Sequence, residues 1–178
     1  MAAPKGTALI TGASTGIGVV YADRLAQRGY DLILVARNEE RLSESAARLK
    51  STGRRIETIV VDLTNKQDVQ RVAERLRTDP TITALVNNAG LGSARKLLDE
   101  KIDDLESMIY LNVTALTRLA LTALPAFVAR KNGLLINIAS VVALAPDLLN
   151  GTYCGTKAYS ASVPAFLVKA GRDARSFS

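Results

Sequence analysis

The sequence predicts an α/β fold, built as a doubly wound parallel sheet with helices on both faces. Short apolar runs alternate with helical patterns along the chain, as expected when a crossover helix follows each strand. Runs such as Leu32–Val35 are apolar at every position, which is typical of strands covered on both faces. With 178 residues, 48% of them hydrophobic, the chain is long enough for a single domain over residues 1–178.

Glycine and asparagine mark several ends of the expected elements. Asn38 is a candidate N-cap for a helix whose Leu42 and Leu49 share one face, and Gly29 and Gly53 are stop signals. The strands are expected at Thr7–Thr11, Leu32–Val35, Ile56–Val61, Ala84–Asn87 and Leu134–Ile138. The helices are expected at Ile17–Arg28, from Asn38 to Gly53, at Lys66–Arg77 and Asp103–Arg130, and onward from Thr152.

The composition excludes several kinds of catalytic site. The chain has no histidine, so a Ser-His-Asp triad, a Cys-His pair and a histidine-ligated zinc site are impossible, and no metal site is expected. Any proton transfer must therefore use Tyr, Lys, Ser, Asp or Glu. The single cysteine, Cys154, cannot form an internal disulfide, which fits a reducing compartment.

Charge and hydropathy bound the partners and the location. The net charge of +6 is spread along the chain, without a basic run that contains aromatic residues, so no nucleic-acid partner is expected. The longest apolar stretches span about a dozen residues, whereas a membrane span needs roughly 20. No apolar segment typical of a secretory signal precedes Thr7. We therefore expect a soluble, cytoplasmic protein without a membrane partner.

A glycine-rich turn stands between the first strand and the first helix. Its sequence is Thr11-Gly12-Ala13-Ser14-Thr15-Gly16-Ile17-Gly18. Glycines in such a turn let the backbone approach a pyrophosphate, and the helix N-terminus offers free N–H groups and a partial positive charge to the anion. A glycine cluster can also be purely structural, so its position between a strand and a helix is what favours a dinucleotide site.

This turn has the spacing G-x-x-x-G-x-G, and with further signals it resembles the short-chain dehydrogenase/reductase family over residues 7–159. Each signal alone has an ordinary structural explanation, since Tyr and Lys at i and i+4, for example, merely share a helix face. Their joint occurrence in order is what carries the resemblance, which implies a Rossmann-like sheet. The further signals are Asp62, Asn87-Asn88-Ala89-Gly90, Asn112, Ser140 and Tyr153-Cys154-Gly155-Thr156-Lys157.

The resemblance implies an oxidoreductase that moves a hydride between a nicotinamide and a small carbonyl or alcohol substrate. Tyr153 would be the general acid or base, and Lys157, one helical turn away, would favour its phenolate and hold the nicotinamide ribose. Ser140 would donate a hydrogen bond to the substrate oxygen, and Asn112 would hold a water. The implied cofactor-binding residues are Gly12, Ser14, Thr15, Gly16, Ile17, Gly18, Arg37, Asp62, Asn88, Ala89, Gly90, Tyr153 and Lys157.

The end of the second strand favours NADP(H) over NAD(H). An acid at this place usually binds the ribose 2′-OH of NAD, whereas an arginine accommodates the 2′-phosphate of NADP. The strand ends Val35-Ala36-Arg37-Asn38, so no acid is present and Arg37 is the candidate phosphate partner. A solvated surface arginine is the alternative, and Thr15 adds no basic residue beside the middle glycine.

After Tyr159 the resemblance ends, and residues 160–178 form an atypical tail. Pro164 falls about three turns into the last helix, where a proline costs about 3 kcal/mol or more, and Gly171–Ser178 shows no strand pattern. We therefore expect a sheet that lacks the last strands and exposes Leu134–Ile138 as its edge. A shifted reading frame and a genuine truncated variant are both open explanations.

The tail also bears on activity and assembly. We expect a chain with this tail to bind cofactor weakly and to turn over poorly. Homo-oligomers are typical of the family, but the tail interrupts a helix that would help to form them. The alternative function is a non-catalytic nucleotide-binding or regulatory protein on the same fold. The complete set of Asn112, Ser140, Tyr153 and Lys157 argues against it.

Overall fold

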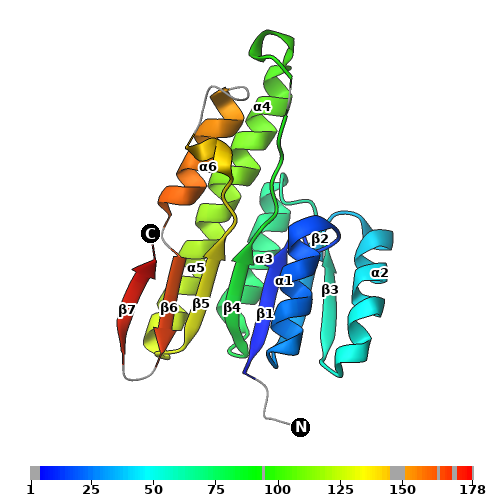
Figure 1. Ribbon diagram of the computed structural model, residues 1–178, viewed down its shortest axis with the longest axis vertical. Coiled ribbons are helices and arrows are strands. Elements are labelled where there is room, and N and C mark those ends of the chain that lie inside the picture. The colour runs from blue at the N-terminus through cyan, green and yellow to red at the C-terminus, as the bar shows by residue number, and fades with distance from the viewer. Residues whose placement is uncertain (1–4, 94, 145–150, 164, 170–171, 178) are drawn as a thin grey trace.

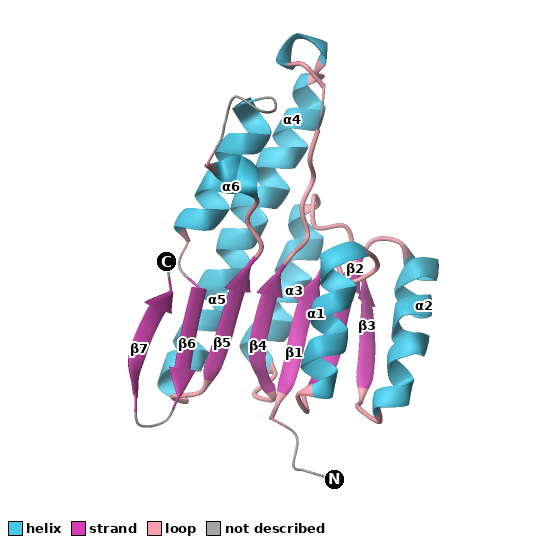
Figure 2. Ribbon diagram, in the orientation of Figure 1, coloured by secondary structure: helices cyan, strands magenta, loops and turns pink. Residues whose placement is uncertain are grey.

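Parallel strands form the centre of the structure, a computed structural model that describes residues 5–93, 95–144, 151–163, 165–169 and 172–177. Neighbouring strands pair in the order β3-β2-β1-β4-β5, every pair parallel (Figures 1 and 2). The predicted doubly wound sheet is thus confirmed. Its strands are β1 (Thr7–Thr11), β2 (Asp31–Ala36), β3 (Ile56–Val60), β4 (Ile82–Asn87) and β5 (Gly133–Asn137).

Helices cover both faces of this sheet and divide the core into two clusters. Leu25 and Leu42 pack with the strands on one face, and Val72, Leu119 and Phe127 pack on the other. All five side chains are nearly inaccessible to solvent, so burial on both faces explains the continuously apolar strands. The helices are α1 (Gly16–Gln27), α2 (Glu39–Leu49), α3 (Lys66–Thr78), α4 (Ile102–Ile109), α5 (Leu116–Ala129) and α6 (Gly151–Ser162).

The predicted long helix is interrupted. Between α4 and α5 the chain forms a π-helical segment, η3 (Tyr110–Ala115), which contains the buried Asn112. The sequence analysis predicted one regular helix over Asp103–Arg130 and did not anticipate this interruption. π-Helical turns occur frequently at functional sites.

By length and composition alone, Ile102–Ala129 is apolar enough to cross a membrane. In the most apolar 18-residue stretch of this segment, 44% of the residues are buried inside the protein. The buried side chains of α5, among them Leu119, Ala123 and Phe127, contact the core beside β4 and β5. A core helix that covers a sheet has this composition for the same reason, so the apolar stretch is weak evidence for a membrane span.

Among the described residues the sheet lacks the later parallel strands, as predicted, but the predicted exposed edge at Leu134–Ile138 is wrong. The parallel strands end at β5 and α6 ends at Ser162, but two antiparallel strands, β6 (Ala165–Lys169) and β7 (Arg172–Phe177), extend the sheet. β5 is therefore not an edge. A strand at the edge of a sheet needs only backbone N–H and C=O groups, so a polar sequence can form one. Pro164, Gly171 and Ser178 lie outside the described residues.

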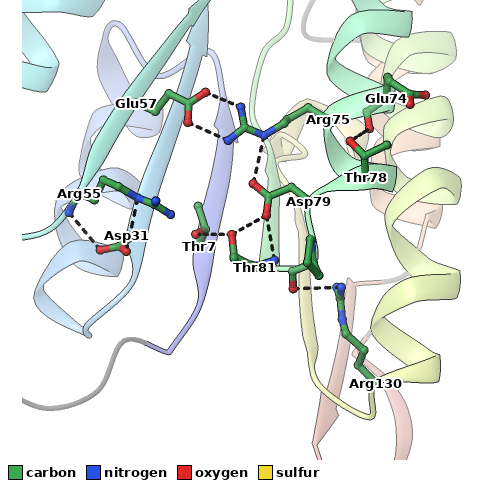
Figure 3. A network of polar contacts seen from close by, with 11 residues as sticks. Thr7, Asp31, Arg55, Glu57, Glu74, Arg75, Thr78, Asp79, Thr81 and Arg130 are labelled. Atoms are coloured by element: carbon green, nitrogen blue, oxygen red, sulfur yellow. Dashed lines mark hydrogen bonds and ion pairs between the residues drawn. The ribbon is translucent and has the colours of Figure 1, made fainter.

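Polar contacts tie the amino ends of the strands together (Figure 3). Arg75 on α3 makes a bidentate ion pair with Glu57 on β3 and a second pair with Asp79, 3.1 Å from its Nε. The Asp79 carboxylate accepts hydrogen bonds from the backbone and side chain of Thr81, and the Thr81 hydroxyl lies 3.1 Å from that of Thr7. These bonds connect β1, β3, α3 and the start of β4.

Asp79 is the acidic centre of this network. Burial raises the pKa of its carboxyl, but hydrogen bonds from Thr81 and Arg75 outweigh burial and hold that pKa below its ordinary value. A carboxyl with a depressed pKa stabilises the fold fully above the pKa of the unfolded chain, about 3.9, and loses this effect as pH falls through the folded pKa.

We therefore predict that Asp79→Ala lowers the free energy of unfolding by about 1–2 kcal/mol at pH 7, because several charge-assisted hydrogen bonds are lost. The difference from wild type should narrow as pH falls below about 3.9. Urea unfolding between pH 7 and about pH 2.5 measures both effects. Glu74→Ala removes the exposed ion pair with Arg77 and is the control, with an expected loss below about 0.5 kcal/mol. Equal losses in the two variants would contradict the assignment.

Candidate active site

A cavity of about 550 Å³ lies at the carboxyl ends of the parallel strands, within the range of about 300–1,000 Å³ of ligand pockets. β1 has β2 on one side and β4 on the other, so the order of the strands reverses here, and ligands bind at such a switch point. Most of the predicted site residues line the cavity. They are Gly12, Ser14, Thr15, Gly16, Ile17, Arg37, Asp62, Asn88, Ala89, Gly90, Ser140, Tyr153 and Lys157.

The glycines of the turn after β1 have different reasons to be glycine. Gly12 and Gly16 have positive φ angles of 66° and 57°, which other residues adopt at a cost. A Cβ on Gly16 would meet no atom within 4 Å, so the space beside it is open. Gly18 does not line the cavity, and a Cβ there would lie 2.3 Å from the carbonyl oxygen of Gly12. Gly18 therefore lets α1 pack against the turn, while Gly16 leaves room for a ligand.

The N-terminus of α1 faces this turn and is suited to an anion. In this helix the N-cap residue Thr15 makes no side-chain capping bond, and no acidic residue stands in the first turn. The first N–H groups of a helix have no partner within the helix, and they carry its partial positive charge. A phosphate in the cavity would satisfy both.

Asn88 fastens the turn after β1 to the segment after β4. Its Nδ2 donates to the carbonyl oxygens of Thr11 and Gly12 at 3.0 and 3.1 Å. The Thr11 hydroxyl oxygen in return accepts from the backbone N–H groups of Asn88 and Ala89, both at 3.0 Å. Asn88 thus acts through the backbone geometry of the loop.

Asp62 and two arginines line the cavity on the side of β2 and β3. The Asp62 Oδ1 accepts from the backbone N–H and the hydroxyl of Thr64, which fixes the carboxylate. Arg37 is exposed at the end of β2. Arg41, in the first turn of α2, also lines the cavity and was missed by the sequence analysis. Its spacing of four residues from Arg37, after the N-cap Asn38, was the available signal.

Tyr153 and Lys157 come from the first turns of α6, which lies beside α4 (Figure 1). Lys157 is 7% exposed, and its Nζ donates to the carbonyl oxygen of Ile138 at 3.0 Å. Burial lowers the pKa of its ammonium group below the ordinary value. A Cβ on Gly90 would lie 3.3 Å from this Nζ, and one on Gly92 would lie 3.2 Å from the Tyr153 ring. Gly92, which the sequence analysis did not single out, therefore makes room for the ring.

Asn112 lies behind the cavity and does not line it. Its Oδ1 accepts from the N–H of Leu91 at 2.9 Å, and its Nδ2 donates to the Leu91 carbonyl and to the Thr156 hydroxyl, at 2.8 and 3.0 Å. The side chain thus joins the segment after β4 to α6. The prediction that Asn112 holds a water stays a prediction.

Ser140 follows β5 and caps the short helix η4 (Val141–Ala143), where its Oγ accepts from the N–H of Val142 at 3.4 Å. Because the oxygen is the acceptor in that bond, the hydroxyl proton can point at a substrate oxygen. Ser140, Tyr153 and Lys157 line the same cavity as the glycine turn. The arrangement combines an anion site with a phenol, a hydroxyl and an ammonium group.

Comparison with known proteins gives one family. The model of the short chain dehydrogenase family matches residues 6–167. The very-long-chain 3-oxoacyl-CoA reductase of Ajellomyces capsulatus is 35% identical over 163 residues, covering 88% of this chain and 48% of that protein. The fatty acyl-CoA reductase of Acinetobacter baylyi is 37% identical over 155 residues, covering 85% and 52%. The chain therefore spans about half the length of these curated relatives.

Solved structures agree with this result. The bulky-bulky ketone specific alcohol dehydrogenase from Comamonas testosteroni has a TM-score of 0.84 and 42% identity, covering 87% of this chain and 63% of that one. A short-chain dehydrogenase from Sphingobium yanoikuyae in complex with NADPH has a TM-score of 0.84 and 46% identity, covering 87% and 61%. At 42% and 46% sequence identity, these two structures share with this chain both the fold and membership of the short chain dehydrogenase family.

The glycine packing yields a prediction. We expect Gly18→Ala to weaken dinucleotide binding at least tenfold, about 1.4 kcal/mol, because the new Cβ would displace the backbone of the turn at Gly12. Fluorescence titration with NADPH measures the change. Gly155→Ala is the control, since Gly155 is exposed in α6 with no atom within 4 Å of the added Cβ. It should bind as wild type and gain about 0.5–1 kcal/mol of stability. Unchanged binding in Gly18→Ala would show that the turn does not contact the ligand.

Proposed function

The chain belongs to the short-chain dehydrogenase family, and on this premise we propose that it is the cofactor-binding and catalytic part of an NADP(H)-dependent oxidoreductase. The reaction would move a hydride between the nicotinamide and a carbonyl or alcohol carbon. One observation carries the proposal. The glycine turn and the group of Ser140, Tyr153 and Lys157 line one continuous cavity.

The residues of the chain fit a dinucleotide. The open space beside Gly16 and the free N-terminus of α1 suit a pyrophosphate, and Asp62 stands at the end of β3, where the adenine would lie. When bound, the nicotinamide supplies or accepts the hydride. Everything else in the reaction would be done by side chains of this chain.

Proton transfer is assigned to Tyr153. For reduction, the phenol would give its proton to the substrate oxygen as the carbon gains the hydride, and Ser140 would donate a hydrogen bond to the same oxygen. The Lys157 ammonium, held by Ile138, would favour the phenolate that remains. Alcohol oxidation would use the same groups in reverse. The chain has no histidine, and besides the Asp62 carboxylate these are the proton carriers that line the cavity.

The two arginines support NADP(H) over NAD(H). Arg37 and Arg41 line the cavity where the ribose 2′-phosphate would lie, and the wall contributed by Ala36 and Asn38 carries no acid that would bind a 2′-OH. The similar dehydrogenase from Sphingobium yanoikuyae is described in complex with NADPH.

A large apolar ketone is the substrate class that we propose. Val141 and Leu144 follow Ser140 closely and are 79% and 89% exposed, so apolar surface lies beside the hydroxyl that would hold the substrate oxygen. The names of the similar proteins specify bulky ketones and very-long-chain 3-oxoacyl-CoA. A non-catalytic nucleotide-binding protein is the second candidate, and it would bind NADPH without reducing any carbonyl.

The primary test is titration of the purified chain with NADPH and NADH, followed by the fluorescence of the cofactor. The protein contains no tryptophan, so its own emission is low. Saturable binding of NADPH together with reduction of an aromatic ketone would support the enzyme. Binding without reduction of any ketone in a broad panel would favour the non-catalytic alternative, and absence of binding would contradict both.

Tyr153→Phe should lower the rate of carbonyl reduction by about 10²–10⁴-fold, because it removes the proton donor. The affinity for NADPH should change little, since the ring is kept. Single-turnover oxidation of NADPH with excess ketone measures the first quantity and fluorescence titration the second. Tyr159→Phe is the matched control, because the Tyr159 hydroxyl contacts Thr117 instead of the cavity. A Tyr153→Phe variant with wild-type rate would refute the assignment.

Arg37→Ala should raise the Kd for NADPH by about 10–100-fold and leave that for NADH within about twofold, because only NADPH carries the 2′-phosphate. Arg41→Ala should act in the same direction. Lys50→Ala, at the exposed C-cap of α2 and outside the cavity, is the control for the loss of one positive charge near that helix. Equal losses for the two cofactors would show that the arginines do not contact the 2′-phosphate.

A further inference from the structure

A serine stands in the buried face of α2, where the helical period predicts an apolar side chain. Leu42, Ser45 and Leu49 are the buried residues of this helix, and Ser45 is fully inaccessible to solvent. A buried hydroxyl costs free energy unless it forms hydrogen bonds. Alanine would fill this position with higher helix propensity and no polar atom. The contacts of the hydroxyl therefore require an explanation.

The single hydroxyl proton of Ser45 is shared between two carbonyl oxygens, and the hydroxyl oxygen accepts from Nη2 of Arg48 at 3.4 Å. The Ser45 Oγ lies 2.9 Å from the carbonyl oxygen of Arg41, a bond common for helical serines, and 3.3 Å from the carbonyl oxygen of Ser14. The second contact crosses 31 positions of sequence to the glycine turn. One side chain thus joins α2 to the turn that is proposed to bind the pyrophosphate.

The bond to Ser14 fixes the orientation of a peptide unit in that turn. The C=O of Ser14 and the N–H of Thr15 belong to one trans peptide, so they point in opposite directions. Holding the carbonyl toward α2 also fixes the direction of the Thr15 N–H. Thr15 is the N-cap of α1 and lines the cavity. The position of a phosphate-binding donor therefore depends on a residue outside the cavity.

We propose that Ser45 is a positioning residue for the cofactor, which orients the Ser14–Thr15 peptide for the pyrophosphate. The inference rests on the proposed cofactor function. Because NADPH and NADH share the pyrophosphate, removal of the hydroxyl weakens both by the same factor. Removal of Arg37 acts on NADPH alone, so the two effects are separable.

The test is fluorescence titration of wild type, Ser45→Ala and Arg37→Ala with NADPH and with NADH, at a temperature where all three are folded. Ser45→Ala raises both Kd values about fivefold, the equivalent of one net hydrogen bond, and leaves kcat within about twofold. Ser43→Ala, an exposed serine of the same helix, is the control and binds as wild type. A serine that only stabilises the fold would change the unfolding temperature and leave both Kd values unchanged.

A second pair of variants guards against poor folding of Ser45→Ala. Ser45→Thr and Ser45→Val have the same shape, and only the threonine keeps the hydroxyl. Valine raises both Kd values about fivefold over threonine. Equal Kd values in this pair, or a change confined to NADPH, overturn the role of Ser45. If wild type binds neither cofactor, the proposed function itself fails, which is a separate outcome.

Discussion

The site depends on the close approach of two loops, the turn after β1 and the segment after β4. The turn after β1 has no room for another atom at this contact, since a Cβ on Gly12 would lie 2.7 Å from the Asn88 amide nitrogen and one on Gly18 would lie 2.6 Å from it. The Thr11 hydroxyl and the Asn88 amide supply the hydrogen bonds that hold it. β1 is next to β4 because the order of the strands reverses at β1. The cavity lies at the carboxyl ends of the strands at this same reversal.

The same segment after β4 also connects the cofactor half of the cavity to the catalytic half. Leu91, three residues after Asn88, exchanges two hydrogen bonds with the Asn112 amide, and that amide donates to Thr156 on α6. Lys157 adds a bond from α6 to Ile138. The geometry of the phenol relative to the glycine turn is therefore set by short, buried bonds. The ion pairs of Arg75 and Asp79 lie at the other end of the strands, where they stabilise the sheet without charging the cavity (Figure 3).

Local signals predicted the parallel part of the fold and most of the cavity, because each acts over a few residues. Asn38 caps α2 through its side chain, and the continuous apolar run of β2 is buried, both as expected. The π-helical segment around Asn112 was not predicted, and the pairing of β6 with β5 depends on backbone contacts between distant segments. Arg41 was missed although its spacing of four residues from Arg37, after the N-cap Asn38, could have indicated it.

Lys157 bears on whether the site is functional. The described ion pairs do not include Lys157, and its burial disfavours the charged form, as the lowered pKa of its ammonium group reflects. An apolar side chain of similar length would fill this place at a lower cost in desolvation. A fold selected only for stability would not need a buried ammonium group one helical turn from a cavity-lining phenol. Departures from the most stable choice concentrate at functional sites, which supports a functional role for Tyr153 and Lys157 over a purely structural one.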